Sequence, residues 1–132
     1  MLTEKERNRY CRQTNLAELG EKGQEKLKNG KVLIIGAGGL GCPSLLYLAA
    51  AGIGKIGIVD FDKVEESNLH RQVLYGTNDI GKQKATVAAK KIEKQYPLIA
   101  TTAIPVQLTS SNAISIIKDY DVIIDGTDNF PT

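Results

Sequence analysis

A β-branched run, a glycine-rich loop and an apolar stretch follow one another in this chain and constrain its fold most strongly. Residues 31–35, KVLII, show no polar alternation after the first residue, which is typical of a parallel strand covered on both faces. The loop GAGGLG comes next, and the apolar stretch after it is long enough for a buried helix that Gly52 would close. Gly36, Gly38 and Gly41 thus match G-x-G-x-x-G between a strand and a helix. Glycines there let backbone N–H groups approach a phosphate, although a turn needed only for close packing is the structural alternative.

The rest of the chain continues the alternation of strands and helices. Two short helices, at residues 4–13 and 21–28, precede the first strand, and further helices are predicted at 81–96 and 110–118. The remaining predicted strands are 55–60, 99–105 and 121–125. This order predicts an α/β fold, a Rossmann-like parallel sheet with helices on both faces and an incomplete doubly wound topology. We expect a helical segment at residues 1–30 and the sheet domain at 31–132.

Composition excludes several classes of protein. The chain has 132 residues and a formal charge of +2, so one domain is expected and bulk charge indicates neither nucleic acid nor a membrane surface as a partner. Cys11 and Cys42, the two cysteines, have no metal-ligand spacing and predict free thiols. The polar amino-terminal residues do not resemble a secretory signal, so a cytoplasmic location is the default expectation.

Charged residues after the second predicted strand distinguish between nucleotides. Asp60 follows Gly41 by 19 residues, a spacing that suits a ribose ligand in NAD-dependent and ATP-dependent proteins alike. Arg71 and Lys84 have no clear task in hydride transfer, whereas a triphosphate undergoing substitution needs fixed cations or a metal. Lys84 also falls near a helix start, from which its ammonium could reach a phosphate.

Two further polar residues have competing interpretations. Asp128 follows the last predicted strand, where a carboxylate could hold a magnesium ion or could serve only the local turn. His70, the one histidine, is expected to pack or to form hydrogen bonds rather than to bind metal or act as a base.

Six motifs together resemble the ThiF, MoeB and HesA family, relatives of ubiquitin-activating enzymes. They are RYCRQ (9–13), GAGGLG (36–41), VDFD (59–62), SNLHRQVLY (67–75), DIGKQKA (79–85) and DGTDN (125–129). The resemblance implies ATP and magnesium as cofactors and a homodimer. It implies that the enzyme activates the C-terminal glycine carboxylate of a ubiquitin-like sulfur carrier protein of the ThiS or MoaD type as an acyl-adenylate. Pyrophosphate would be released.

The resemblance also implies roles for individual residues. The reaction would depend on Arg12, Arg71, Lys84 and Asp128, with Arg12 reaching the neighbouring subunit's ATP and Asp128 holding magnesium. The expected nucleotide site comprises Gly36, Gly38, Gly39, Gly41, Asp60, Asp62, Ser67, Asn68, Leu69, His70, Arg71, Gln72, Lys84, Asp128 and Asn129.

Family members continue past DNFPT, so this chain is expected to be the ATP-binding portion of a longer protein. Any zinc site or reactive cysteine would lie in that further half. Two alternatives stay open: an NAD-dependent oxidoreductase, and a nucleotide-binding or dimerisation module without catalysis. The sequence does not identify the sulfur pathway that the carrier protein would serve.

Overall fold

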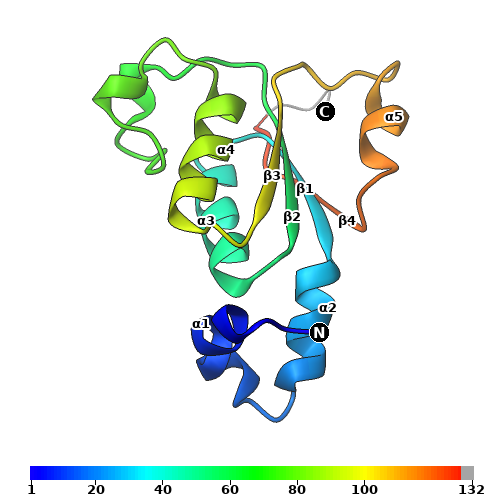
Figure 1. Ribbon diagram of the computed structural model, residues 1–132. Coiled ribbons are helices and arrows are strands. Elements are labelled where there is room, and N and C mark those ends of the chain that lie inside the picture. Colours follow the sequence, from blue (N-terminus) through cyan, green and yellow to red (C-terminus); the bar gives the residue numbers. More distant parts are fainter. Residues whose placement is uncertain (129–132) are drawn as a thin grey trace.

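A four-stranded parallel sheet with helices on both faces forms the body of the protein (Figure 1). The computed structural model describes residues 1–128. The strands are β1 (Lys31–Ile35), β2 (Lys55–Val59), β3 (Ala100–Ile104) and β4 (Val122–Asp125), and their order across the sheet is β3-β2-β1-β4. The chain therefore runs outward from β1 through β2 to β3 and then crosses back to β4 on the other side of β1, so the strand order reverses while all four strands stay parallel. The predicted Rossmann-like fold is confirmed.

The two faces of the sheet are covered by different helices. The larger core lies between the sheet and helices α3 (Gly41–Ala51) and α4 (Lys84–Gln95), and the smaller one lies on the opposite face, where α5 (Ala113–Ile117) packs. Alternate residues of β1 serve the two cores: Ile34 belongs to the first and Leu33 to the second, both without exposed surface. The longest helix, α4, has 12 residues, so no helix of the described residues could cross a bilayer.

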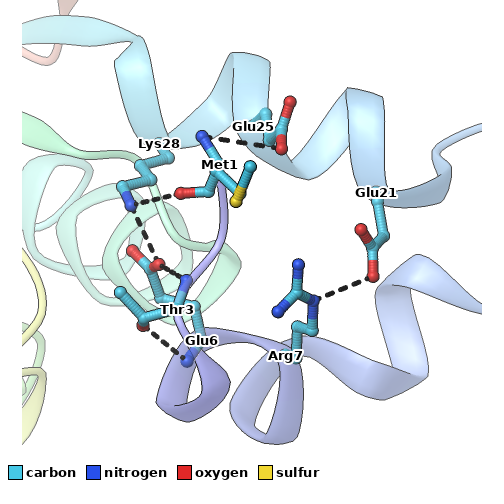
Figure 2. Close-up of polar contacts among 7 residues, drawn as sticks. All are labelled: Met1, Thr3, Glu6, Arg7, Glu21, Glu25 and Lys28. Atoms are coloured by element: carbon cyan, nitrogen blue, oxygen red, sulfur yellow. Dashed lines mark hydrogen bonds and ion pairs between the residues drawn. The ribbon is translucent and has the colours of Figure 1, made fainter.

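The amino-terminal helices α1 (Glu4–Thr14) and α2 (Gly20–Asn29) lie beyond the amino ends of the strands (Figure 1). Figure 2 shows Lys28 holding this segment together, because its Nζ donates to the Met1 carbonyl at 3.0 Å and to Glu6 Oε2 at 2.9 Å. Thr3 and Glu6 form the predicted capping box. Burial alone would raise the pKa of Glu6, but hydrogen bonds from Thr3 and Lys28 outweigh it and lower that pKa.

One long connection, residues 60–83, joins β2 to α4 and is called the crossover loop below. It contains two 3-10 helices, η1 (Glu66–Asn68) and η2 (Thr77–Asp79). Its ends are fastened together, since the Val64 N–H donates to the Lys82 carbonyl at 2.8 Å and the Gly81 N–H donates to the Val64 carbonyl at 2.9 Å. The loop is thereby held at one end of the sheet rather than extended into solvent.

Most predicted elements match, but two helices start three residues late: α5, predicted at 110–118, spans only Ala113–Ile117, and α4 also differs at its start. The pattern predicted a helix from Gly81, but the helix begins at Lys84. Gly81 has a φ of +83°, which is outside the helical range, and Gln83 pairs with Lys63 in an isolated bridge. Tertiary pairing of the crossover loop therefore delays the helix by three residues.

Substitution of Gly57 is expected to disturb the smaller core. A Cβ atom at this position in β2 would overlap the phenol of Tyr120 and lie 2.8 Å from Leu33 Cδ1. We expect Gly57→Ala to lower the free energy of unfolding by about 1–3 kcal/mol, because the core cannot absorb another methyl group without displacing a ring. Urea denaturation measures this. Gly76→Ala is the matched control, since its nearest atom is 3.9 Å away. Equal stability of the two variants would contradict the packing described here.

Candidate nucleotide site

A cavity of about 710 Å³ opens at the carboxyl ends of β1, β2 and β4. This is the point where the strand order reverses, and open α/β sheets bind ligands there. The volume falls within the range of sites for small-molecule ligands. The cavity is lined by Ile35, Gly36, Gly38, Gly39, Leu40, Val59, Asp60, Phe61, Asp62, Asn68, Arg71, Gln72, Lys84, Val106, Gln107, Leu108, Gly126, Thr127 and Asp128.

The glycine loop brings unpaired backbone N–H groups to this cavity. Gly36 has a φ of +90°, and a Cβ there would lie 3.0 Å from the backbone of Gly126. A Cβ on Gly41 would overlap the Gly36 carbonyl, so the third glycine lets α3 start directly against the end of β1. The N–H groups of Gly38 and Gly39 donate to no other group among residues 1–128. Together with the start of α3 they suit an anion.

Asp60 supports the glycine loop and still has acceptor capacity. Its Oδ2 accepts from the Ala37 N–H and its Oδ1 from the Asp62 N–H, each at 2.8 Å. Each carboxylate oxygen has a second lone pair, and Asp60 lines the cavity. The side chain can therefore accept from ribose hydroxyls while it fixes the loop.

Lys84, the first residue of α4, is the most unusual charge of the site. It is only 5% exposed and lines the cavity, yet its Nζ has no hydrogen bond or ion pair with any of residues 1–128. The burial of Lys84 is that of its stem, because the Nζ is not among the buried side-chain atoms of residues 1–128 that lack a partner. A bound anion would pair with this ammonium at the cavity. Arg71 is exposed and donates to Asn68 Oδ1 at 3.3 Å. It lies over the glycine loop, because a Cβ on Gly39 would be 2.7 Å from its Nη1.

Two aspartates, Asp125 and Asp128, lie at the turn after β4, and the sequence left the role of Asp128 ambiguous. Asp125 serves the turn: its Oδ1 accepts from the Thr127 hydroxyl at 2.6 Å and from the Thr127 N–H at 3.0 Å. These bonds, the hydroxyl first, lower the pKa of Asp125. Asp128 instead lines the cavity with an exposed side chain. Local turn chemistry is thus assigned to Asp125, whereas the Asp128 side chain forms no hydrogen bond with any of residues 1–128.

Apolar residues form a part of the cavity that the sequence interpretation missed. Phe61 at the end of β2 is 53% exposed, and Val106, after β3, is 41% exposed. Leu108 completes this lining from the same connection. A flat apolar base would find contacts here. The available signal was that Val106 and Leu108 directly follow a strand, although their residue types are equally typical of a core.

The structure brings together ten of the predicted site residues and leaves five of the described ones outside the cavity lining. Gly36, Gly38, Gly39, Asp60, Asp62, Asn68, Arg71, Gln72, Lys84 and Asp128 line the cavity. Gly41 is buried behind the loop, Leu69 packs against the larger core, and Ser67 is exposed away from the lining. His70 was expected to pack or to form hydrogen bonds, but it is exposed and its side chain forms no hydrogen bond with residues 1–128. Arg12 lies on α1 at the opposite end of the sheet (Figure 1), and Asn129 lies outside the described residues.

The side chains available as metal ligands indicate which kind of magnesium site is possible. Residues 1–128 contain no cluster of three or more side chains that could hold an ion. Magnesium binds with one or two carboxylates and takes its other ligands from phosphate oxygens and water. Asp128 at the cavity fits such an ion, which would arrive with a triphosphate, and does not fit a resident metal centre.

Asp79 anchors the crossover loop to α4. Its Oδ2 accepts from the Gly76 N–H at 2.8 Å and from Lys91 Nζ, which also donates to the Leu74 carbonyl at 2.8 Å. Burial alone would raise the pKa of Asp79, but the bonds from Lys91 and Gly76 outweigh it and lower that pKa. The ionised carboxylate therefore stabilises the fold.

Loss of this carboxylate is expected to show a defined pH dependence. A lowered pKa in the folded state contributes stability above the unfolded pKa of about 4 and loses it as pH falls through the folded value. Asp79→Asn should therefore reduce the free energy of unfolding at pH 7, and its difference from the unmodified protein should close below about pH 4. Denaturation series at both pH values measure this, with exposed Asp119→Asn as control. A difference that persists at low pH would contradict the assignment.

Comparison with known proteins agrees with this geometry. The model of the ThiF family matches residues 10–132. The sulfur carrier protein adenylyltransferase of Thermus thermophilus is 53% identical over 130 residues, which are 98% of this chain and 48% of that protein. The probable adenylyltransferase/sulfurtransferase MoeZ of Mycobacterium tuberculosis is 54% identical over 131 residues, 99% of this chain and 33% of that protein.

Solved structures share the fold. The crystal structure of E. coli tRNA N6-threonylcarbamoyladenosine dehydratase matches with a TM-score of 0.91 and 28% identity, over 98% of this chain and 54% of that one. The same enzyme in complex with ATP matches with a TM-score of 0.90 and 28% identity, over 98% and 53% of the two chains. The chain thus spans about half or less of the length of these relatives. Its motifs, its fold and the extent of the family match show that the chain belongs to the ThiF family.

Proposed function

We propose that the protein containing this chain is an adenylyltransferase whose cavity at the carboxyl ends of the strands binds ATP. Its substrate would be the C-terminal glycine carboxylate of a ubiquitin-like sulfur carrier protein. The observation that carries the proposal is Lys84, a lysine with a buried stem that lines the cavity and whose Nζ has no partner among the described residues. Two relatives named as adenylyltransferases, and a structural neighbour solved with ATP, support it.

The shape of the cavity fits the parts of the nucleotide. The apolar residues Phe61, Val106 and Leu108 would contact the base, and Asp60 would accept from the ribose. The phosphates would lie between the glycine loop on one side and Arg71 and Lys84 on the other. In a nicotinamide dinucleotide, the pyrophosphate binds largely to loop and helix N–H groups. Such a ligand would therefore leave one of the two cations, Arg71 or Lys84, without a phosphate partner.

The chemistry needs positioning more than a protein nucleophile. A carboxylate oxygen of the carrier attacks the α-phosphorus, the bond to the pyrophosphate oxygen breaks, and pyrophosphate leaves with the electron pair. Lys84 and Arg71 would neutralise charge on the phosphates, and the loop N–H groups would orient them. Magnesium, when bound, would neutralise charge on the leaving group, with Asp128 as its protein ligand.

Arg12 fits this proposal only across a subunit boundary. It lies on α1, beyond the amino ends of the strands, whereas the cavity opens at their carboxyl ends (Figure 1). It would therefore approach the nucleotide of a second copy, as the resemblance implied, and a homodimer is part of the proposal.

Exchange of labelled pyrophosphate into ATP, with the full-length protein and its carrier, tests this function. We expect exchange that depends on the carrier and is lost when the terminal glycine of the carrier is removed. Calorimetry with ATP and magnesium, compared with NAD, separates the oxidoreductase alternative. Preference for NAD would end the proposal, and ATP binding without exchange would favour a module without catalysis.

A further inference from the structure

Tyr75 joins three segments of the candidate site through its hydroxyl and backbone. It lies in the crossover loop and is 6% exposed. Its hydroxyl donates to the Ala37 carbonyl at 2.7 Å and lies 3.4 Å from the Lys84 carbonyl. Its backbone N–H donates to the Gln72 carbonyl at 3.1 Å, which closes the turn directly after Arg71 and Gln72.

Each of these three segments carries a group expected at the phosphates. Ala37 stands between Gly36 and Gly38 in the glycine loop. The turn that Tyr75 closes begins at Gln72, directly after Arg71, and the Lys84 carbonyl belongs to a lysine that lines the cavity. No residue of the apolar part of the cavity forms a hydrogen bond with Tyr75 among the described residues.

The Ala37 peptide is held from both sides. Its N–H donates to Asp60 and its carbonyl accepts from Tyr75, with the Cys42 thiol 3.4 Å away as a second, weaker donor. Burial raises the pKa of the Tyr75 hydroxyl far above neutral pH, so the hydroxyl keeps its proton and remains a donor. The orientation of the following loop N–H groups therefore depends on a bond that the sequence interpretation did not consider.

We infer that Tyr75 is a positioning residue for the triphosphate: its hydroxyl fixes the glycine loop and the start of α4 to the crossover-loop turn that directly follows Arg71. This inference rests on the proposed function for the identity of the ligand. A ring without the hydroxyl would still fill the core, so the packing and positioning roles of Tyr75 are separable by one atom.

Tyr75→Phe tests the role directly in the full-length protein, by calorimetry with ATP and with AMP. We expect the Kd for ATP to rise about 10-fold, because a buried acceptor loses its main donor, while the Kd for AMP rises less than about 3-fold. General loosening of the fold would weaken both nucleotides alike, so the ratio of the two constants reports positioning. The control is Tyr10→Phe, a buried tyrosine of α1 at 4% exposure, which should change neither constant.

Amide hydrogen exchange on the nucleotide-free protein tests the role of Tyr75 independently of the proposed function, because it requires no ATP binding. Tyr75→Phe should speed exchange in the loop at residues 37–40 and in the first turn of α4, with Tyr10→Phe leaving both unchanged. If the unmodified protein failed to bind ATP, the proposed function would be wrong. Amide hydrogen exchange would still show whether the Tyr75 hydroxyl holds the glycine loop and the start of α4 together. Unchanged exchange, or equal weakening of ATP and AMP, would overturn the inference.

Discussion

Replacement of Lys84 by methionine is expected to weaken ATP binding by about 10- to 100-fold, the range for loss of hydrogen bonds to a charged group. Methionine fills the space of the lysine stem and removes only the charge. Because Lys84 is 5% exposed and its Nζ has no partner among residues 1–128, the substitution should leave the stability of the nucleotide-free protein unchanged or raise it. The affinity for ATP should therefore fall while the free energy of unfolding stays the same or rises.

Calorimetry and urea denaturation on the same preparations measure the two effects of Lys84→Met. Lys82→Met is the matched control, because Lys82 is exposed two residues earlier and does not line the cavity. It should change neither quantity. A Lys84 variant that binds ATP as well as the control does would contradict the role of the Lys84 ammonium at the phosphates.

Replacement of Gly41 by alanine is expected to destabilise the protein by about 3 kcal/mol, at the upper end of the cost of overpacking. The added methyl group would overlap the Gly36 carbonyl, and neither backbone segment can move without separating α3 from the end of β1. ATP binding should fall as well, since the loop N–H groups depend on that contact. Denaturation and calorimetry measure the two losses.

Gly38→Ala separates the effect on folding from the effect on the ligand. Its Cβ would meet only the Gln72 amide, at 3.4 Å, so the free energy of unfolding should change by less than about 1 kcal/mol. ATP should still bind less well, because the methyl group stands beside the N–H groups that face the cavity. Equal stability losses for the Gly38 and Gly41 variants would contradict the account of the loop.

The strands were predictable because their sequence signal is local. β1 occupies the residues expected, since a β-branched run between Gly30 and Gly36 leaves little choice of boundary. The start of α4 was not predictable, because it depends on pairing between Gln83 and Lys63 across the crossover loop. Such pairing involves residues 20 positions apart that carry no pattern of their own.

Some residues of the candidate site could likewise be predicted from local sequence, and others could not. Charged residues and glycines such as Lys84 and Gly36 could be predicted as site residues, because their chemistry is unusual after an apolar strand. Phe61, Val106 and Leu108 could not be distinguished from core residues until the sheet order placed their strand ends around one cavity. Tyr75 was equally hidden, because a hydrogen bond to a carbonyl 38 residues away leaves no trace in the sequence.

The most direct test of the nucleotide assignment is a crystal structure of the full-length protein with ATP or a non-hydrolysable analogue. The account predicts Lys84 Nζ and the Arg71 guanidinium within hydrogen-bonding distance of phosphate oxygens, with the phosphates against the N–H groups of the glycine loop. A nucleotide bound elsewhere, or one whose phosphates point away from Lys84 into solvent, would contradict it.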